Sequence, residues 1–387
     1  MQNEQLVSRL NDKRMGKRLS ALKGLLPELE KSQSFYTPIT NINYVFRTVY
    51  SCFDRSPSLA VYYSEKFGMP LTAIVDYASL AATDELIKAK KITGGTYYCG
   101  AEVAVQTQSG KRIILSAVGV PHKNVKAFND DLYTYRAKRL IYTNALREKL
   151  NARFKKHQIS LPYDFWSFFG AIKTTSVEDL YVNLASKIID KFQTGDKIIE
   201  FLTSVLGLEL LDDENLKLAD TSSTLYVFDL AYALKNKLVV KHPDEQLNRA
   251  EDFLTLCVKY GAISSATYKG GDLDEFLSEI VGLGVNSATA EFNAENQEFM
   301  QEFYDKCMQR GILPIIRTLV AHPRKKLDGK FTSSELAQKF NDNARCIVGH
   351  EISSSINPDD GMFTNTSLER CPSLEERIKL YSRIALK

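Results

Sequence analysis

The stretch that decides the fold reads Leu71-Thr-Ala-Ile-Val-Asp76, a short and nearly continuous apolar run that ends in an acid. Before it, residues 42–50 are rich in β-branched and aromatic side chains, and residues 58–67 form a helix-like stretch that ends at Gly68. A buried parallel strand lacks the clean polar and apolar alternation of a half-exposed strand. The pattern therefore predicts a strand, helix, strand unit of a parallel sheet.

The same unit returns near the C-terminus, where three predicted helices each end at a glycine before an apolar run. Glycine adopts the left-handed conformation that closes many helices, so each glycine marks a helix end. The three units are helix 251–260 with strand 262–268, helix 274–283 with strand 285–291, and helix 295–309 with strand 312–320. A fourth unit is predicted, from a capping box at residues 332–335 to a strand at residues 344–348.

Strands and helices that alternate at both ends of the chain predict an α/β fold, a (β/α) barrel that is closed by its two termini. An open doubly wound sheet is the alternative architecture. The sequence contains no Gly-x-Gly-x-x-Gly motif and no Walker glycine-lysine loop. Nothing therefore favours a nucleotide-binding version of that sheet.

The middle of the chain is predicted to be a helical insertion over residues 123–249. Residues 123–161 contain neither glycine nor proline, and a capping box at residues 175–178 begins a second helical stretch. Lysine and arginine greatly outnumber acids in the first stretch. Such a helix could cover the barrel mouth and attract phosphate or carboxylate, and an ordinary solvated helix face is the alternative.

Residues 1–33 are expected to form an amphipathic helical arm in which leucines alternate with basic residues. Contact with a membrane surface or with nucleic acid is one interpretation. The favoured interpretation is a surface helix that packs against its own domain or a second subunit. The expected organisation is therefore this arm, a first barrel part over 34–122, the insertion over 123–249, and a second barrel part with the C-terminal tail over 250–387.

The composition describes an ordinary folded protein of 387 residues, of which 44% are hydrophobic and 25% are charged. A formal charge of +3 is too small to favour nucleic-acid binding. Six scattered cysteines with no Cys-x-x-Cys pair indicate reduced thiols. No signal-peptide core is seen at the start, and no run approaches the roughly 20 apolar residues of a membrane span. We therefore expect a cytoplasmic protein that does not enter a membrane.

Three short motifs resemble the PHP (polymerase and histidinol phosphatase) family. They are Val45-Phe-Arg47-Thr-Val-Tyr-Ser51, Val75-Asp76-Tyr77 and Gly100-Ala-Glu102-Val103. The family pattern has His-x-His-Thr-x-x-Ser in the first motif and Val-Asp-His in the second, so Val45, Arg47 and Tyr77 stand where histidines are expected. Among these early metal ligands only Glu102 remains. The resemblance implies a divergent member with a distorted (β/α)7-type TIM-like barrel and a helical insertion.

The resemblance covers most of residues 35–351. Late in the chain, the aligned family segment has Gly-Glu-Asp before a Pro-Arg step, whereas this sequence has Arg317-Thr318-Leu319 and retains Pro323-Arg324. Gly349-His350-Glu351 matches the Gly-His-Glu of the family at the last strand end. Valine has no donor atom, arginine is cationic and tyrosine ionises only in a strong metal field, so none replaces a neutral imidazole. The usual hydrolytic metal cluster is therefore not expected.

Our first hypothesis is a non-catalytic protein that binds a small anionic or phosphorylated ligand and needs no cofactor. The expected ligand-binding residues are Arg47, Tyr77, Glu102, Arg324 and His350. A guanidinium in the former metal pocket repels cations and can hold phosphate or carboxylate through two hydrogen bonds.

The alternative from the enzyme class is a metal-dependent phosphoesterase with a reduced site. In it, Asp76, Glu102 and His350 would hold one divalent cation, namely zinc, manganese or iron. A third hypothesis is a purely structural partner that makes contact through the basic arm. Assembly into a homo-oligomer stays open in all three cases.

Overall fold

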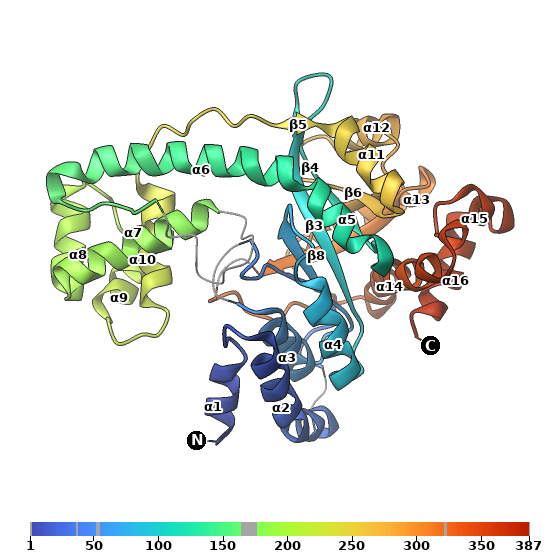
Figure 1. Ribbon diagram of the computed structural model, residues 1–387, viewed down its shortest axis with the longest axis horizontal. Helices are drawn as coiled ribbons and strands as arrows, with labels where there is room; N and C mark the ends of the chain where they lie inside the picture. The colour runs from blue at the N-terminus through green and yellow to red at the C-terminus, as the bar shows by residue number, and fades with distance from the viewer. Residues whose placement is uncertain (1, 36–37, 52–54, 164–175, 321–322, 387) are drawn as a thin grey trace.

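The computed structural model of the chain describes residues 2–35, 38–51, 55–163, 176–320 and 323–386 (Figure 1). Within these residues, seven strands close into a barrel in the order β2-β1-β8-β7-β6-β4-β3, and the ring is completed by pairing of β2 with β3. A two-residue strand, β5, extends the sheet beside the end of β3. The strands are β1 (Tyr44–Phe46), β2 (Thr72–Tyr77), β3 (Tyr97–Gln106), β4 (Arg112–Val118), β5 (Asn248–Arg249), β6 (Ile263–Thr267), β7 (Ser287–Glu291) and β8 (Leu313–Val320). The predicted α/β barrel is therefore confirmed at the level of a closed, mixed barrel.

One strand of the barrel breaks the regular alternation of strand and helix. β4 runs antiparallel to both of its neighbours, β3 and β6, whereas the other barrel strands pair in parallel. Only residues 107–111 connect β3 to β4, and Gly110 adopts a positive φ of 83° in this turn. So short a connection joins antiparallel strands only, because a parallel crossover needs a dozen or more residues.

Helices surround the barrel strands. They are α3 (Pro57–Phe67), α4 (Thr83–Thr93), α11 (Ala250–Tyr260), α12 (Leu273–Gly282), α13 (Gln297–Gln309), α14 (Ser334–Ile356), α15 (Asn365–Arg370) and α16 (Leu374–Ile384). Gly68 and Gly261 are left-handed caps that end α3 and α11, as the sequence predicts.

The predicted strand at residues 344–348 is wrong, because these residues lie in the middle of α14. Their side chains are buried or half-buried, and α14 packs against α16 and the barrel. A helix that is buried on several sides gives the same short apolar run as a buried strand, so periodicity does not separate the two. His350, which was expected at a strand end, is consequently a helical residue.

The N-terminal arm packs on the barrel through α1 (Gln2–Arg9) and α2 (Met15–Phe35). Leu22 and Leu25 of α2 are fully buried in the main core. Arg18 forms a buried ion pair with Glu85 of α4. The arm therefore contacts its own chain, as the favoured interpretation expects.

Between β4 and β5 the chain is helical in its described part. The elements are α5 (Val125–Asp131), α6 (Tyr133–Phe154), α7 (Val177–Phe192), α8 (Gly195–Glu200), α9 (Asp212–Ala219) and α10 (Tyr226–Lys237). Figure 1 shows α6 leaving the barrel and α7 to α10 gathering around its far end. Leu184, Leu202 and Leu230 belong to a separate core there. None of the described helices combines the length and the apolar character that crossing a membrane requires.

Candidate functional site

The candidate site lies at the carboxyl-terminal ends of the parallel strands, where side chains from several strands converge. Arg47 directly follows β1, and Tyr77 is the last residue of β2. Glu102 pairs in register with Tyr77, and Arg317 pairs in register with Glu291 at the end of β7. This end of a (β/α) barrel is where its functional groups usually gather.

Glu102 is the electrostatic centre of the site. Its two carboxylate oxygens accept hydrogen bonds from different guanidinium groups, one from Arg47 and the other from Arg317. Glu102 is only 3% exposed. Burial alone would raise the pKa of this carboxyl, but the charges of Arg47 and Arg317 lower the pKa to about 2. Glu102 is therefore an anion at neutral pH, and two cations enclose it.

The chain of charges continues along the mouth of the barrel. Arg317 also donates from Nε to Glu291 at 2.8 Å, and Lys269 lies 3.7 Å from the same carboxylate. Cations and anions thus alternate from Arg47 to Lys269. In the sequence, Arg317 was noted only because it stands where the PHP family pattern has acidic residues. An arginine inside the apolar run of residues 313–320 was the signal that this side chain has a partner in the barrel interior.

Asp76 is occupied by hydrogen-bond donors from the loop that follows β1. It accepts from the backbone N–H of Thr48 at 2.7 Å, from the Thr48 hydroxyl at 2.5 Å and from the Ser51 hydroxyl at 2.5 Å. Burial raises the pKa of Asp76, and these donors partly offset that effect. Asp76 therefore organises the loop that carries Arg47.

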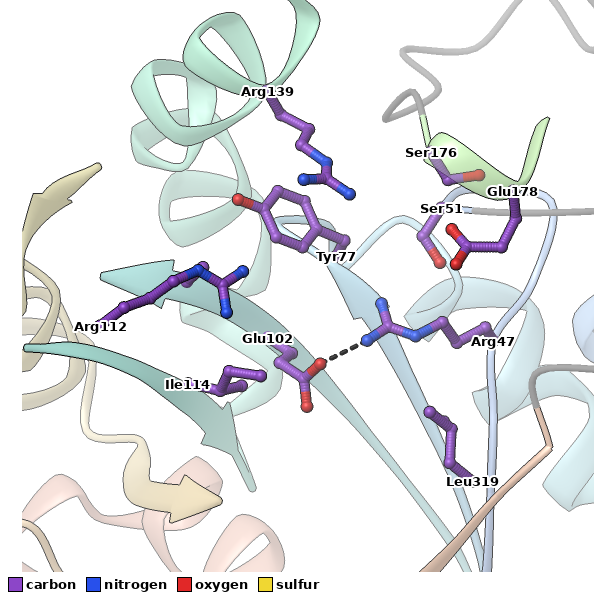
Figure 2. Close-up of a pocket in the computed structure, with 11 residues that line it drawn as sticks. Arg47, Ser51, Tyr77, Glu102, Arg112, Ile114, Arg139, Ser176, Glu178 and Leu319 are labelled. Carbon is purple, nitrogen blue, oxygen red and sulfur yellow. Dashed lines mark hydrogen bonds and ion pairs between the residues drawn. The ribbon is translucent and has the colours of Figure 1, made fainter. Parts of the chain in front are cut away.

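A cavity of about 190 Å³ opens beside Glu102 (Figure 2). Arginines come from three directions: Arg47 from the end of β1, Arg112 from β4 and Arg139 from α6. In Figure 2 the side chains of all three extend toward the space around Glu102 and Tyr77. The other lining residues are Ser51, Ala104, Ile114, Ser176, Glu178 and Leu319. Arg47 thus faces the cavity, as the first hypothesis requires.

Glu245, in the segment before β5, holds two of these arginines. Arg139 donates to it at 2.8 Å, and Arg112 lies 3.4 Å from its other oxygen. The Arg139 guanidinium also lies over the rings of Tyr77 and Tyr142, 5.1 and 5.2 Å from their centroids. Burial raises the pKa of Tyr77, so its phenol stays protonated. Arg139 is therefore fixed by two rings and a carboxylate.

Two lining residues belong to the start of α7. Ser176 caps this helix, because its hydroxyl accepts from the backbone N–H of Asp179 at 3.0 Å. Glu178 forms an ion pair with Lys235 of α10. Burial would raise the pKa of Glu178, but the charge of Lys235 lowers it. The basic stretch that contains Arg139 was considered as a cover of the barrel mouth, but sequence reasoning did not select Arg112, Arg139, Ser176 or Glu178 as site residues. The approach of the last three to the barrel depends on how α6 and α7 pack.

Two of the predicted site residues lie elsewhere. His350 accepts from the backbone N–H of Met362 at Nδ1 and bonds the Gly261 carbonyl through Nε2, both at 2.9 Å. Gly261 precedes β6, so His350 lies toward the amino-terminal ends of the strands, away from Glu102. Arg324 makes two hydrogen bonds of 2.5 Å to Asp229 of α10 and does not line the cavity. The structure therefore brings together Arg47, Tyr77 and Glu102 only.

The residues suggested for a divalent cation do not fit one. Glu102 gives both oxygens to guanidinium groups, and Asp76 is satisfied by three donors. His350 has both ring nitrogens engaged at the opposite end of the barrel. A hard cation needs several free oxygens at one point, which these side chains do not offer.

Comparisons with known proteins do not assign the chain to a family. No family model matches it. No curated protein matches it either. One similar solved structure is a candidate metal-dependent phosphoesterase from Bifidobacterium adolescentis, at 15% identity and a TM-score of 0.49, covering 78% of this chain and 96% of that one. Another is an amidohydrolase from Chromobacterium violaceum with bound sulfate and no metal, at 14% identity and a TM-score of 0.47, covering 78% and 97%. Membership of the PHP family therefore stays a prediction from the sequence.

Proposed function

We propose that the cavity beside Glu102 binds a small anion, such as phosphate or a small phosphorylated molecule, without converting it. The convergence of Arg47, Arg112 and Arg139 on one cavity carries this proposal. Guanidinium groups offer planar pairs of N–H donors that match the oxygens of phosphate and carboxylate. The two acids of the lining, Glu102 and Glu178, already have cationic partners, so they repel an incoming anion less than free carboxylates would.

The size of the cavity selects a small ligand. Pockets for drug-sized molecules usually measure about 300–1,000 Å³. A cavity of about 190 Å³ is smaller than this range, and it holds on the order of six water molecules. It therefore suits inorganic phosphate, sulfate or a phosphorylated fragment of a few carbon atoms.

The state of the acids supports the proposal of binding without turnover. A general base needs a pKa near the working pH, but the pKa of Glu102 is about 2 and its oxygens are occupied. The described lining residues include no histidine and no cysteine. Water in this cavity consequently lacks a described group that could activate it.

Isothermal titration with inorganic phosphate tests the proposal. We expect saturable binding at one site. Replacing Arg139 by Gln removes a lining cation, and we expect the affinity to fall by about tenfold, the effect of losing about one charge-assisted hydrogen bond. Arg153→Gln on the same helix is the matched control, because Arg153 is exposed outside the lining.

Three results would oppose the proposal. The absence of measurable phosphate binding would reject an anion site, and equal losses in the Arg139 and Arg153 variants would reject this cavity. Stoichiometric zinc, manganese or iron that survives dialysis, together with hydrolysis of p-nitrophenyl phosphate, would instead support the reduced phosphoesterase site.

A further inference from the structure

A second and larger cavity lies on the outside of the barrel, between α3, the start of α10 and the segment that follows β8. Its volume is about 710 Å³, within the usual range for sites that take small organic molecules. None of its lining residues is shared with the cavity beside Glu102. A ligand of this outer cavity is therefore independent of the anion proposed for the cavity beside Glu102.

Three aromatic residues are among those that line this outer cavity. Tyr63 and Phe67 are one helical turn apart on α3, and their ring centroids are 6.2 Å apart. Phe228 of α10 also lines the cavity, and all three side chains are half-buried. Partly exposed rings offer faces and edges to another flat ring system, and such ring pairs contribute about 0.5–1.5 kcal/mol beyond area burial.

Basic residues also line the outer cavity. Lys325 and Lys326 are adjacent, exposed and without an ion pair or hydrogen bond to any residue the structure describes. Arg55 also lines the cavity and donates to the Val320 carbonyl at 3.0 Å. Asp328 is the acidic residue among the described lining residues. The lining of the cavity therefore combines aromatic rings with an excess of positive charge.

We propose that the outer cavity binds an aromatic anion, a molecule with a flat ring system and a sulfate, phosphate or carboxylate group. The ring would contact Tyr63, Phe67 and Phe228, and the anionic group would lie against Lys325 and Lys326. An uncharged ring would leave the lysines without a counterion. A bare anion would leave the aromatic rings exposed to water. A ligand that carries both parts satisfies the rings and the lysines together.

Titration calorimetry with naphthalene-1-sulfonate tests this, using the full chain. We expect one site per chain. In competition with naphthalene-1-sulfonate, which does not count sulfate bound beside Glu102, 1-naphthol and inorganic sulfate should each bind the outer cavity at least about tenfold more weakly, because each offers only one of the two interactions. Replacing both Lys325 and Lys326 by Glu should weaken naphthalene-1-sulfonate binding by about tenfold or more. Phe67→Leu, which keeps an apolar side chain but removes the ring, should weaken it by a smaller factor.

The matched control is the double replacement of Lys155 and Lys156 by Glu. This is another pair of adjacent exposed lysines, and neither lines the outer cavity. It makes the same change in net charge, and we expect it to leave the affinity unchanged. The four lysines are exposed, so circular dichroism should show both double variants folded.

Several outcomes would overturn the proposal. Naphthalene-1-sulfonate that fails to bind, or that binds the Lys325 and Lys326 variant as well as the wild type, would reject it. Equal losses of affinity in both double variants would mean that net charge alone, and not the outer cavity, determines binding. Loss of binding in a variant with Arg112→Gln and Arg139→Gln, but not in the Lys325 and Lys326 variant, would place the ligand in the cavity beside Glu102.

Discussion

Arg317 of β8 forms an ion pair with Glu102 of β3 across the inside of the barrel, between residues 215 positions apart in the sequence. The two strands are not neighbours, since β1 and β2 separate them on one side of the ring and β7, β6 and β4 on the other. Arg47 binds the second oxygen of the same carboxylate. The Glu102 carboxylate therefore links β3 to β8 and to the end of β1 across the barrel interior. Backbone hydrogen bonds connect β3 to these two strands only through their neighbours around the ring.

We predict that Glu102→Gln destabilises the protein strongly. The replacement leaves Arg47 and Arg317 without their common counterion, and removing one partner of a buried ion pair costs about 3–5 kcal/mol. Urea denaturation followed by circular dichroism measures the change in the free energy of unfolding. Glu275→Gln is the control, because its ion pair with Lys111 is exposed and should contribute less than about 1 kcal/mol. Similar losses in the two variants would contradict a structural role for Glu102.

The pKa of Glu102 predicts how this stabilisation depends on pH. The folded-state pKa is lowered to about 2 from an ordinary value of 4.5, so the unfolded chain binds the proton first as the pH falls. The contribution is fully present above about pH 4.5 and is lost as the pH approaches 2, a total of about 3 kcal/mol. The difference in unfolding free energy between wild type and Glu102→Gln should therefore shrink through this window. A constant difference would show that the charge of Glu102 is not the cause.

We predict that burial of His350 causes a loss of stability at a less acidic pH than the loss caused by Glu102. Burial lowers the pKa of its imidazole to about 4 from 6.5, and the hydrogen bond to the Gly261 carbonyl offsets this only in part. The unfolded chain takes up the proton first, so stability should fall as the pH decreases from 6.5 toward 4. His350→Gln should flatten this part of the curve, measured by urea denaturation at a series of pH values. The exposed His242→Gln is the control, and parallel curves for wild type and His350→Gln would contradict the prediction.

Much of the barrel could be predicted, because its parallel strands are short apolar runs next to glycine-capped helices. Gly68 and Gly261 marked real helix ends. The wrong strand at residues 344–348 has a physical cause: α14 is buried over much of its surface, which hides its helical period. The antiparallel direction of β4 was missed although the short connection at residues 107–111 indicates it.

The sequence predicted only those residues of the candidate site that lie on or directly after consecutive strands. Arg47 directly follows β1, Tyr77 ends β2, and Glu102 lies within β3 in register with Tyr77, so their proximity follows from the parallel order of three successive strands. Arg139 comes from α6, and its position depends on how a long helix leaves the barrel. Glu245 is more distant still, in an irregular segment with no local signal. The positions of such residues depend on long-range packing, and a local sequence pattern does not predict that packing.

Glu245 is the residue through which we predict that the anion site is preorganised. It binds Arg112 and Arg139 and so fixes guanidinium groups from β4 and α6 before a ligand arrives, which lowers the entropy cost of binding. We predict that Glu245→Gln weakens phosphate binding by about tenfold in calorimetry, although it removes a negative charge. Asp244→Asn is the matched control, because this exposed neighbour makes the same change in charge without a contact to either arginine. Equal effects would mean that net charge alone matters, and tighter binding in Glu245→Gln would mean that Glu245 competes with the ligand for the arginines.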